Sequence, residues 1–339
     1  MKRVIEPGQL ADQTSLGRLL SEVEAGGEQA RAVLAALPVP ASTPHRLGIT
    51  GSPGTGKSTL AARLIGLLRA AGERVGVVAV DPTSPFSGGA ILGDRLRLLE
   101  HQLDPGVFIR SLASRGSLGG VAPGAGATAT VLEAAGYSRI LIETVGVGQT
   151  GYDVICLADT VVVLLSPESG DAVQLLKAGV LEIGDIFAVN KSDRPGAEAL
   201  MKELELSLDL NSLTSTDLLH HGAGSLPVAA ITAAPPATEG NGWRPPVVRL
   251  IAKEGEGVAE LARAVEAHRL WLQSLGPEHP RRRLRLAREI TFSLRAELAN
   301  LLDGILAPEV DRLAHEVQEG NLKLWDAITM LRARVRSAL

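Results

Sequence analysis

The chain has 339 residues, 45% of them hydrophobic and 3% aromatic, with a formal net charge of −4. This composition suffices for a sizeable core, while the acidic balance and the scarcity of aromatic side chains argue against a protein that binds nucleic acid. A single cysteine, Cys156, excludes an intramolecular disulfide, and no signal-peptide core or apolar run of about 18 residues is present, so the sequence predicts a cytoplasmic protein without a membrane span.

Residues 10–37 predict two short amphipathic helices that are interrupted near Gly26 and Gly27. A proline-containing linker follows, so residues 1–44 are assigned to a helical N-terminal extension. From Leu47 onward, short apolar runs alternate with helical segments, and several runs are continuously apolar, as in strands buried on both faces of a mostly parallel sheet. The predicted strands are RLGIT (46–50), VGVVAV (75–80), VFIR (107–110), RILIE (139–143), TVVVLL (160–165), IFAVN (186–190), PVAAIT (227–232) and VVRLI (247–251).

The chain from Val258 onward has a helical pattern throughout. The first of these helices is expected to pack back on the sheet, and two further helical stretches are expected at 283–302 and 308–338. Residues 275–339 are accordingly predicted to form a separate helical region. Its basic run RRRLRLAR, at 281–288, is interpreted as the solvated face of a helix, with contact to nucleic acid or to an acidic partner as the alternative.

A phosphate-binding loop is predicted between the first strand and the helix that follows it. The sequence GSPGTGKS matches the pattern G-x-x-x-x-G-K-[ST], in which main-chain N–H groups and a helix N-terminus face phosphate oxygens. Lys57 is expected to reach the β- and γ-phosphates, and the Ser58 hydroxyl to bind magnesium. The predicted phosphate-binding residues are Gly51, Ser52, Pro53, Gly54, Thr55, Gly56, Lys57, Ser58 and Thr59. The motif and the alternating pattern predict an α/β P-loop nucleotide-binding domain over 45–274, with helices on both faces of its sheet.

Magnesium requires further oxygen ligands, which carboxylates usually provide. Asp81 ends a predicted strand and should lie at the same edge of the sheet as the phosphate loop, and Asp94 and Glu143 are the other candidates. A single acidic residue at a strand end is more often a helix cap or a turn former. Several near one phosphate loop favour a metal site that consists of Ser58, Asp81, Asp94 and Glu143.

Gly146, Gly148 and Gly151 form a G-x-G-x-x-G pattern after the strand RILIE, and Asp171 follows twenty residues later. This spacing is formally that of a dinucleotide-binding fingerprint. The segment ETVG favours a different interpretation, in which Glu143 addresses magnesium and the Gly146 amide senses a γ-phosphate. Loss of that phosphate on hydrolysis would release the following loop, as in nucleotide switches, so we prefer the switch to a dehydrogenase.

The segment NKSD, at 190–193, follows another predicted strand and indicates which base is bound. The two carboxylate oxygens of Asp193 can accept hydrogen bonds from the N1–H and the exocyclic amine of guanine. Adenine offers no such pair of donors, so GTP is expected to be preferred to ATP. Lys191 is expected to lie along the base and ribose, and Asn190 to connect the base loop to the phosphate loop.

The combination of these motifs resembles the methylmalonyl-CoA mutase-associated GTPases, the MeaB/ArgK group, over residues 47–270. Five segments carry the resemblance: GSPGTGKST, AVDPTSPFSGGAILGD, SLGGV, ETVGVGQT and AVNKSD. It implies a parallel-sheet G domain with a helical N-terminal extension and a C-terminal helical dimerisation arm, in which Asp81, Asp94 and Glu143 help Ser58 to organise magnesium. It also implies an extra switch, SPESGDAVQLLKAG, in which Lys177 moves toward the nucleotide when a partner docks; without the resemblance, Lys177 is simply a lysine on a helix surface.

The resemblance further implies a homodimeric GTPase that binds GTP, GDP and Mg²⁺ and accompanies an adenosylcobalamin-dependent acyl-CoA mutase. Such proteins gate cofactor loading, protect the mutase and hydrolyse GTP slowly until the mutase accelerates them. The candidate catalytic residues are then Lys57, Glu143, Gly146 and Lys177. Methylmalonyl-, isobutyryl-, ethylmalonyl- and hydroxyisobutyryl-CoA mutases all remain as partners. The alternatives are an ATP-dependent kinase associated with a basic amino-acid transport system and a nucleotide-switched assembly scaffold.

This sequence departs from the family pattern at three places. The segment after GGV lacks the usual basic residues, and Gly151 replaces an acidic switch residue. Near the purine, Ile251 and Ala252 replace the usual small polar pair. Ala252 and Lys253 are nevertheless expected to contribute backbone contacts to the base.

Overall fold

A computed structural model of the chain describes residues 3–40, 43–81, 98–113, 122, 124–144, 153–169, 180–217, 242–276 and 280–338. Asp94, Gly146, Gly148, Gly151, Asp171, Lys177 and the predicted strand 227–232 lie outside these residues. The chain divides into two compact units, Met1–Glu289 and Ile290–Leu339. The division falls fifteen residues later in the chain than the start of the helical region expected at 275.

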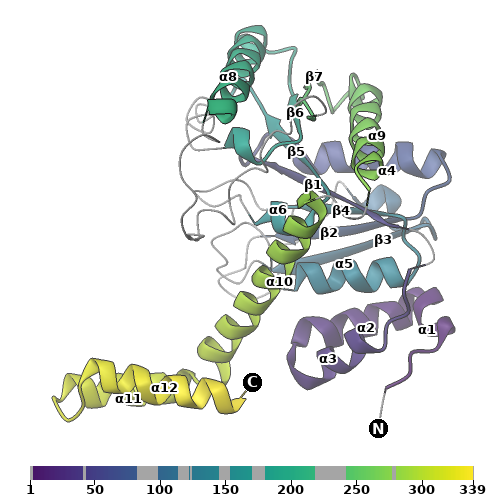
Figure 1. Cartoon of the computed structure of the whole chain (residues 1–339). Helices are drawn as coiled ribbons and strands as arrows, with labels where there is room; N and C mark the ends of the chain where they lie inside the picture. Colours follow the sequence, from purple (N-terminus) through teal and green to yellow (C-terminus); the bar gives the residue numbers. More distant parts are fainter. Residues whose placement is uncertain are drawn as a thin grey trace. The chain divides into compact units, whose positions relative to one another are not determined.

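The first unit contains a seven-stranded, wholly parallel sheet (Figure 1). Its strands are β1 (His45–Gly51), β2 (Val75–Asp81), β3 (Val107–Ala113), β4 (Arg139–Glu143), β5 (Thr160–Leu165), β6 (Ile186–Val189) and β7 (Val247–Arg249), in the order β3-β2-β4-β1-β5-β6-β7. Seven of the eight predicted runs are these strands. Strands β1, β2, β5 and β6 are buried along their whole length, which explains why their sequences are continuously apolar rather than alternating.

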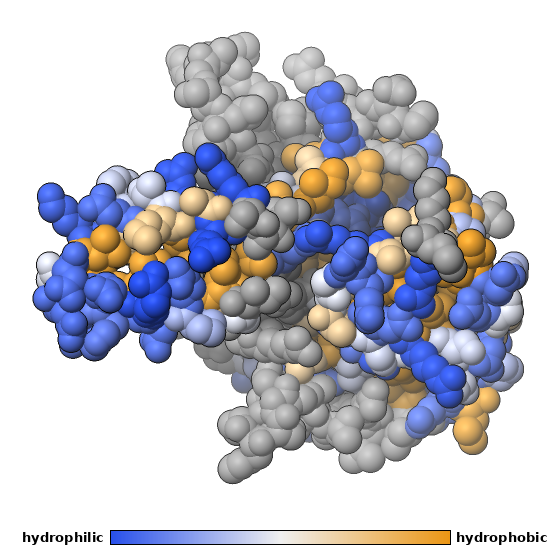
Figure 2. All heavy atoms as spheres, turned by 90° about the horizontal axis from the view of Figure 1, so that it is seen from below, coloured by the Kyte–Doolittle hydropathy of each residue, from blue (hydrophilic) through white to orange (hydrophobic). Residues whose placement is uncertain are grey.

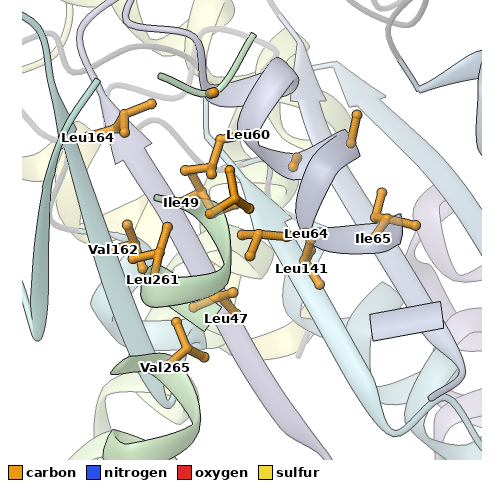
Figure 3. Close-up of a cluster of buried hydrophobic side chains, with 14 of the residues drawn as sticks. Leu47, Ile49, Leu60, Leu64, Ile65, Leu141, Val162, Leu164, Leu261 and Val265 are labelled. Atoms are coloured by element: carbon orange, nitrogen blue, oxygen red, sulfur yellow. The ribbon is translucent and has the colours of Figure 1, made fainter. Parts of the chain in front are cut away.

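Helices cover both faces of this sheet, which confirms the predicted fold class (Figure 1). Helix α4 (Lys57–Ala70) and helix α9 (Val258–Ser274) pack together on one face, and α5 (Ala125–Ala134) packs on β2 and β4. Figure 3 shows Leu60 and Leu64 of α4 and Leu261 of α9 meeting side chains of the central strands. These leucines are at most 2% exposed, so close packing in an apolar core fixes the start of α4.

This unit also contains the long helix α8 (Ala197–Asp217) and three short elements, α6 (Val154–Leu157), η2 (Leu99–His101) and η3 (Val180–Glu182). Among the described residues, no helix is long and apolar enough to cross a membrane.

The N-terminal helices pack beside α5. They are α1 (Pro7–Ala11), α2 (Gln13–Ala25) and α3 (Gly27–Ala35), so the interruption expected near Gly26 is confirmed and one further short helix precedes it. The Asp12 carboxylate caps α2 by accepting a hydrogen bond of 2.7 Å from Ser15 N. Arg110 of β3 forms an ion pair with Glu24, and this pair ties α2 to the edge of the sheet.

A buried arginine joins the start of β1 to two helices. Arg46 pairs with Glu133 of α5 and with Glu289 of α10 (Pro280–Asn300), each at 2.6 Å. Burial by itself lowers the pKa of Arg46, but the hydrogen bonds and charges of the two glutamates outweigh it and raise the pKa. Because removing one partner would leave a buried charge uncompensated, this network fixes the first part of α10 on the sheet.

A second polar group at this end of the sheet gives a prediction about pH. His45 is 5% exposed and shares a hydrogen bond of 2.8 Å with Thr160 Oγ1. Burial lowers the pKa of His45 to about 4, although the Asp159 carboxylate opposes this shift. The unfolded chain therefore binds more protons than the folded chain between pH 4 and the ordinary histidine pKa near 6.5, so stability is lost as the pH falls through this window.

We expect the free energy of unfolding to decrease by about 2 kcal/mol between pH 7 and pH 5 because of His45 alone. Urea unfolding of the wild-type chain and of His45→Gln at both pH values measures this term, since glutamine keeps a donor but does not titrate. The variant should show the smaller decrease. Equal decreases in the two proteins would show that His45 does not titrate as its burial requires.

The second unit is helical. The C-terminal part of α10 is followed by a π-helical turn, Leu301–Ile305, and by α11 (Ala307–Gln318) and α12 (Leu324–Ala338). The helical stretch expected at 308–338 consists of two helices, because Gly320 has a φ of +77° and the N–H groups of Asn321 and Leu322 turn back to Glu316 O. Apolar side chains of this unit lie on its surface between charged ones (Figure 2); they include Ile290, Leu294, Val310, Leu324, Trp325, Ile328 and Met330.

Candidate functional site

The phosphate loop connects β1 to α4, and two of its residues must be glycine. A Cβ at Gly51 would lie 2.2 Å from Leu164 O, and one at Gly56 would lie 2.5 Å from Asn190 Nδ2. Both residues also have φ values in the left-handed region, +151° and +97°. The Thr55 hydroxyl donates to Ser52 O at 2.8 Å, which closes the loop on itself. The loop is therefore shaped by its own backbone and by the neighbouring strands.

Lys57 begins α4 and is only 8% exposed. Its ammonium group donates to Gly51 O at 2.9 Å and to Ser52 O at 3.1 Å, so it lies within the curve of the loop. The first N–H groups of a helix have no partner inside the helix, and they carry a partial positive charge. A fixed ammonium group beside a helix N-terminus is the arrangement that binds a phosphate chain.

Three oxygen-bearing side chains lie at the carboxyl edge of the sheet. Ser58 Oγ donates to Glu143 Oε1 at 2.6 Å, although the two residues lie 85 positions apart. Glu143 ends β4 and is opposite Ala79 of β2, so Asp81 lies two residues further along the neighbouring strand. Asp81 is 4% exposed. A hydroxyl and carboxylates are the hard oxygen donors that magnesium prefers, so these side chains fit such an ion.

Asn190 connects the phosphate loop to residues 251–257, which follow β7 and are called the base loop below. Its Nδ2 donates to Thr55 O at 2.7 Å, and its Oδ1 accepts from Ala252 N at 2.9 Å. Lys191 has a φ of 55° and pairs with Glu168 at 2.7 Å. The Asp193 side chain is 49% exposed, so its carboxylate is accessible from solvent. The structure thus places the NKSD segment at the same edge of the sheet as the phosphate loop.

The predicted base-contacting residues Ala252 and Lys253 differ in what their backbone offers. The Ala252 N–H already donates to Asn190, and its side chain is 1% exposed within the core. In the described part of the chain, the Lys253 N–H has no hydrogen-bond partner. Lys253 is therefore the residue of the pair with a backbone donor available for a base.

Several contacts of this site carry no signal in the sequence. The Ser192 hydroxyl donates to Leu250 O at 2.8 Å and fixes the NKSD segment on the chain beyond β7, and Glu168 holds Lys191. Ser192 occupies the variable position of the motif, and Glu168 lies in the separate segment SPESGDAVQLLKAG. The sequence does not indicate that either residue makes these contacts, because they depend on which strands are neighbours.

A phosphate loop after β1, a carboxylate at the end of β4 and an Asn-Lys-x-Asp segment after β6 define a P-loop GTPase. Residues 16–304 match the family model described as methylmalonyl Co-A mutase-associated GTPase MeaB, and the chain belongs to this family.

Individual similar proteins support the assignment of the chain to this family. A Pyrococcus abyssi protein named as a GTPase is 40% identical over 329 residues, which cover 97% of this chain and 94% of that protein. A mouse protein named methylmalonic aciduria type A homolog, mitochondrial, is 31% identical over 281 residues, covering 78% of this chain and 62% of that protein. The crystal structure of a LAO/AO transport system kinase has a TM-score of 0.58 at 21% identity, with 97% of this chain and 95% of that chain covered. This last similarity shows the shared fold.

Proposed function

We propose that this GTPase is a chaperone of an adenosylcobalamin-dependent acyl-CoA mutase of the methylmalonyl-CoA type, and that it gates cofactor loading and protects the mutase. The family match over residues 16–304 carries the proposal, because the family is described by its association with that mutase. The matched range includes most of α2 and all of α3 as well as the nucleotide site. The name of the mouse relative, which refers to methylmalonic aciduria, supports the same metabolic setting.

The phosphates of GTP are bound by the loop from Gly51 to Thr59 in this proposal. Lys57 leaves the loop carbonyls to which it donates and neutralises charge on the β- and γ-phosphate oxygens. Ser58, Asp81, Asp94 and Glu143 would hold magnesium, which would supply further positive charge to the phosphates. Catalysis is then mainly positioning and charge neutralisation while water attacks in line.

The base is selected by Asp193, whose carboxylate accepts two hydrogen bonds from guanine. Lys191 lies along the base and ribose, and Asn190 keeps the base loop in register with the phosphate loop through its bonds to Thr55 and Ala252. The Lys253 N–H completes the recognition of the base. A carboxylate facing adenine would remain without a donor, which is costly once it is desolvated.

Switching is assigned to two residues outside the described part of the chain. The Gly146 amide senses the γ-phosphate, and Lys177 moves toward the nucleotide when the mutase docks. Hydrolysis is accordingly slow in the isolated protein and faster in the complex. We further propose a cytoplasmic homodimer assembled through the helical C-terminal region. The exposed apolar side chains of this region could be buried in such an interface.

Phosphate release from GTP and from ATP, with and without an adenosylcobalamin-dependent mutase, tests the proposal. We expect release that is selective for GTP and that rises at least about tenfold when the mutase is added, as for GTPases whose site is completed by a partner. If phosphate release is selective for GTP but no acyl-CoA mutase tested changes its rate, a mutase is not the partner. That result would favour an assembly scaffold. ATP-selective release with transfer to an acceptor would instead support the kinase.

A further inference from the structure

Arg63 lies in α4, two turns after the phosphate loop, and its side chain reaches the base loop. The Nη2 group donates to Lys253 O at 2.7 Å, and Nε lies 3.4 Å from Ala252 O. These contacts span about 190 positions of the sequence. The helix that begins at the phosphate-binding lysine therefore also holds the loop expected at the purine.

The same loop is fixed from its other sides. Asn190 holds the Ala252 N–H and donates to Thr55 O in the phosphate loop. The Ala252 side chain belongs to one apolar core with Leu60 of α4 and Leu261 of α9. Arg63 alone among these groups binds the two consecutive carbonyls that follow the Ala252 N–H.

The contact between Arg63 and Ala252 O also determines the direction of the Lys253 N–H. Ala252 O and Lys253 N–H belong to one planar trans peptide, so they point in opposite directions. Fixing the carbonyl on Arg63 turns the Lys253 N–H away from α4, and the second bond, to Lys253 O, fixes the next peptide plane. Among the described residues this N–H has no hydrogen-bond partner, and the Glu256 and Gly257 N–H groups further along the loop also have none.

We propose that Arg63 is a positioning residue for base recognition: it orients the peptide of the base loop so that the Lys253 N–H faces the purine. The inference rests on the proposed guanine-nucleotide site. Arg63 does not touch the base itself, and it acts before any chemical step. Loss of the Arg63 side chain should therefore weaken nucleotide binding. The rate at which bound GTP is hydrolysed should stay unchanged.

The test compares Arg63→Ala with Arg263→Ala, which removes an exposed arginine of α9. A fluorescent GDP analogue reports the dissociation constant, and inorganic tripolyphosphate, which has no base, serves as a competitor for the phosphate loop. For Arg63→Ala we expect the GDP dissociation constant and the KM for GTP to rise about 3- to 10-fold, because hydrogen bonds from a charged group are lost. The affinity for tripolyphosphate and kcat at saturating GTP should stay unchanged, and Arg263→Ala should resemble the wild type.

A conservative variant separates orientation from a general structural effect. Arg63→Lys keeps one charged donor, so its GDP affinity should lie between those of Arg63→Ala and the wild type. Equal weakening of GDP and tripolyphosphate, or a fall in kcat with KM unchanged, would overturn the inference, as would unaltered GDP affinity in Arg63→Ala. A wild-type protein that binds ADP as tightly as GDP would instead contradict the proposed base site, which keeps the two failures distinguishable.

Discussion

Replacing Lys57 by alanine is expected to lower kcat for GTP hydrolysis by at least about 1,000-fold. The ammonium group is almost buried and is held by two carbonyls of the phosphate loop, so its charge is preorganised for the phosphates. Water that enters the vacated space would screen the charge developing on the phosphates but would not neutralise it. Single-turnover phosphate release at saturating GTP measures the effect on chemistry apart from binding.

The control for this experiment is Lys202→Ala, which removes an exposed lysine of α8. Its rate should match that of the wild type, and thermal unfolding of both variants should show that the fold is retained. Hydrolysis by Lys57→Ala within tenfold of the wild-type rate would contradict the assignment of this loop to the phosphates.

The second large effect is expected at Asp193. Asp193→Asn should weaken GTP binding by about 1,000-fold and favour xanthosine triphosphate over GTP, because the amide presents a donor where guanine also presents one. Xanthine has a carbonyl at that position and can accept from the new amide. Since the Asp193 side chain is half exposed, the substitution should leave the free protein stable. Competition of both nucleotides against a fluorescent GDP analogue measures the two affinities.

An exposed carboxylate elsewhere provides the matched comparison. Asp311→Asn in α11 makes the same chemical change far from the base loop in sequence, and its nucleotide preference should not move. If Asp193→Asn binds GTP as tightly as the wild type, Asp193 does not contact the base. The preference for guanine would then have to come from the backbone of the base loop.

The sequence alone was sufficient for features that depend on neighbouring residues. The strands were recognisable because β1, β5 and β6 are buried on both faces and are therefore continuously apolar. The phosphate loop was recognisable because its glycines, Lys57 and Ser58 must follow one another within a single turn. The helical pattern at 308–338 did not reveal the break at Gly320, whose left-handed conformation ends one helix before another begins.

The tertiary structure decided which of these local features meet. The bonds from Asn190 to Thr55 and Ala252, from Ser58 to Glu143, and from Arg63 to Lys253 join residues that are 62 to 190 positions apart. Their contacts depend on the strand order, which places β1 between β4 and β5 with β6 and β7 beyond. Helix packing and crossover connections set that order. Neither produces a periodic sequence pattern from which the contacting residues could be recognised. The local sequence thus determined the phosphate and base motifs, and only the packed sheet determined that one helix, α4, supports both.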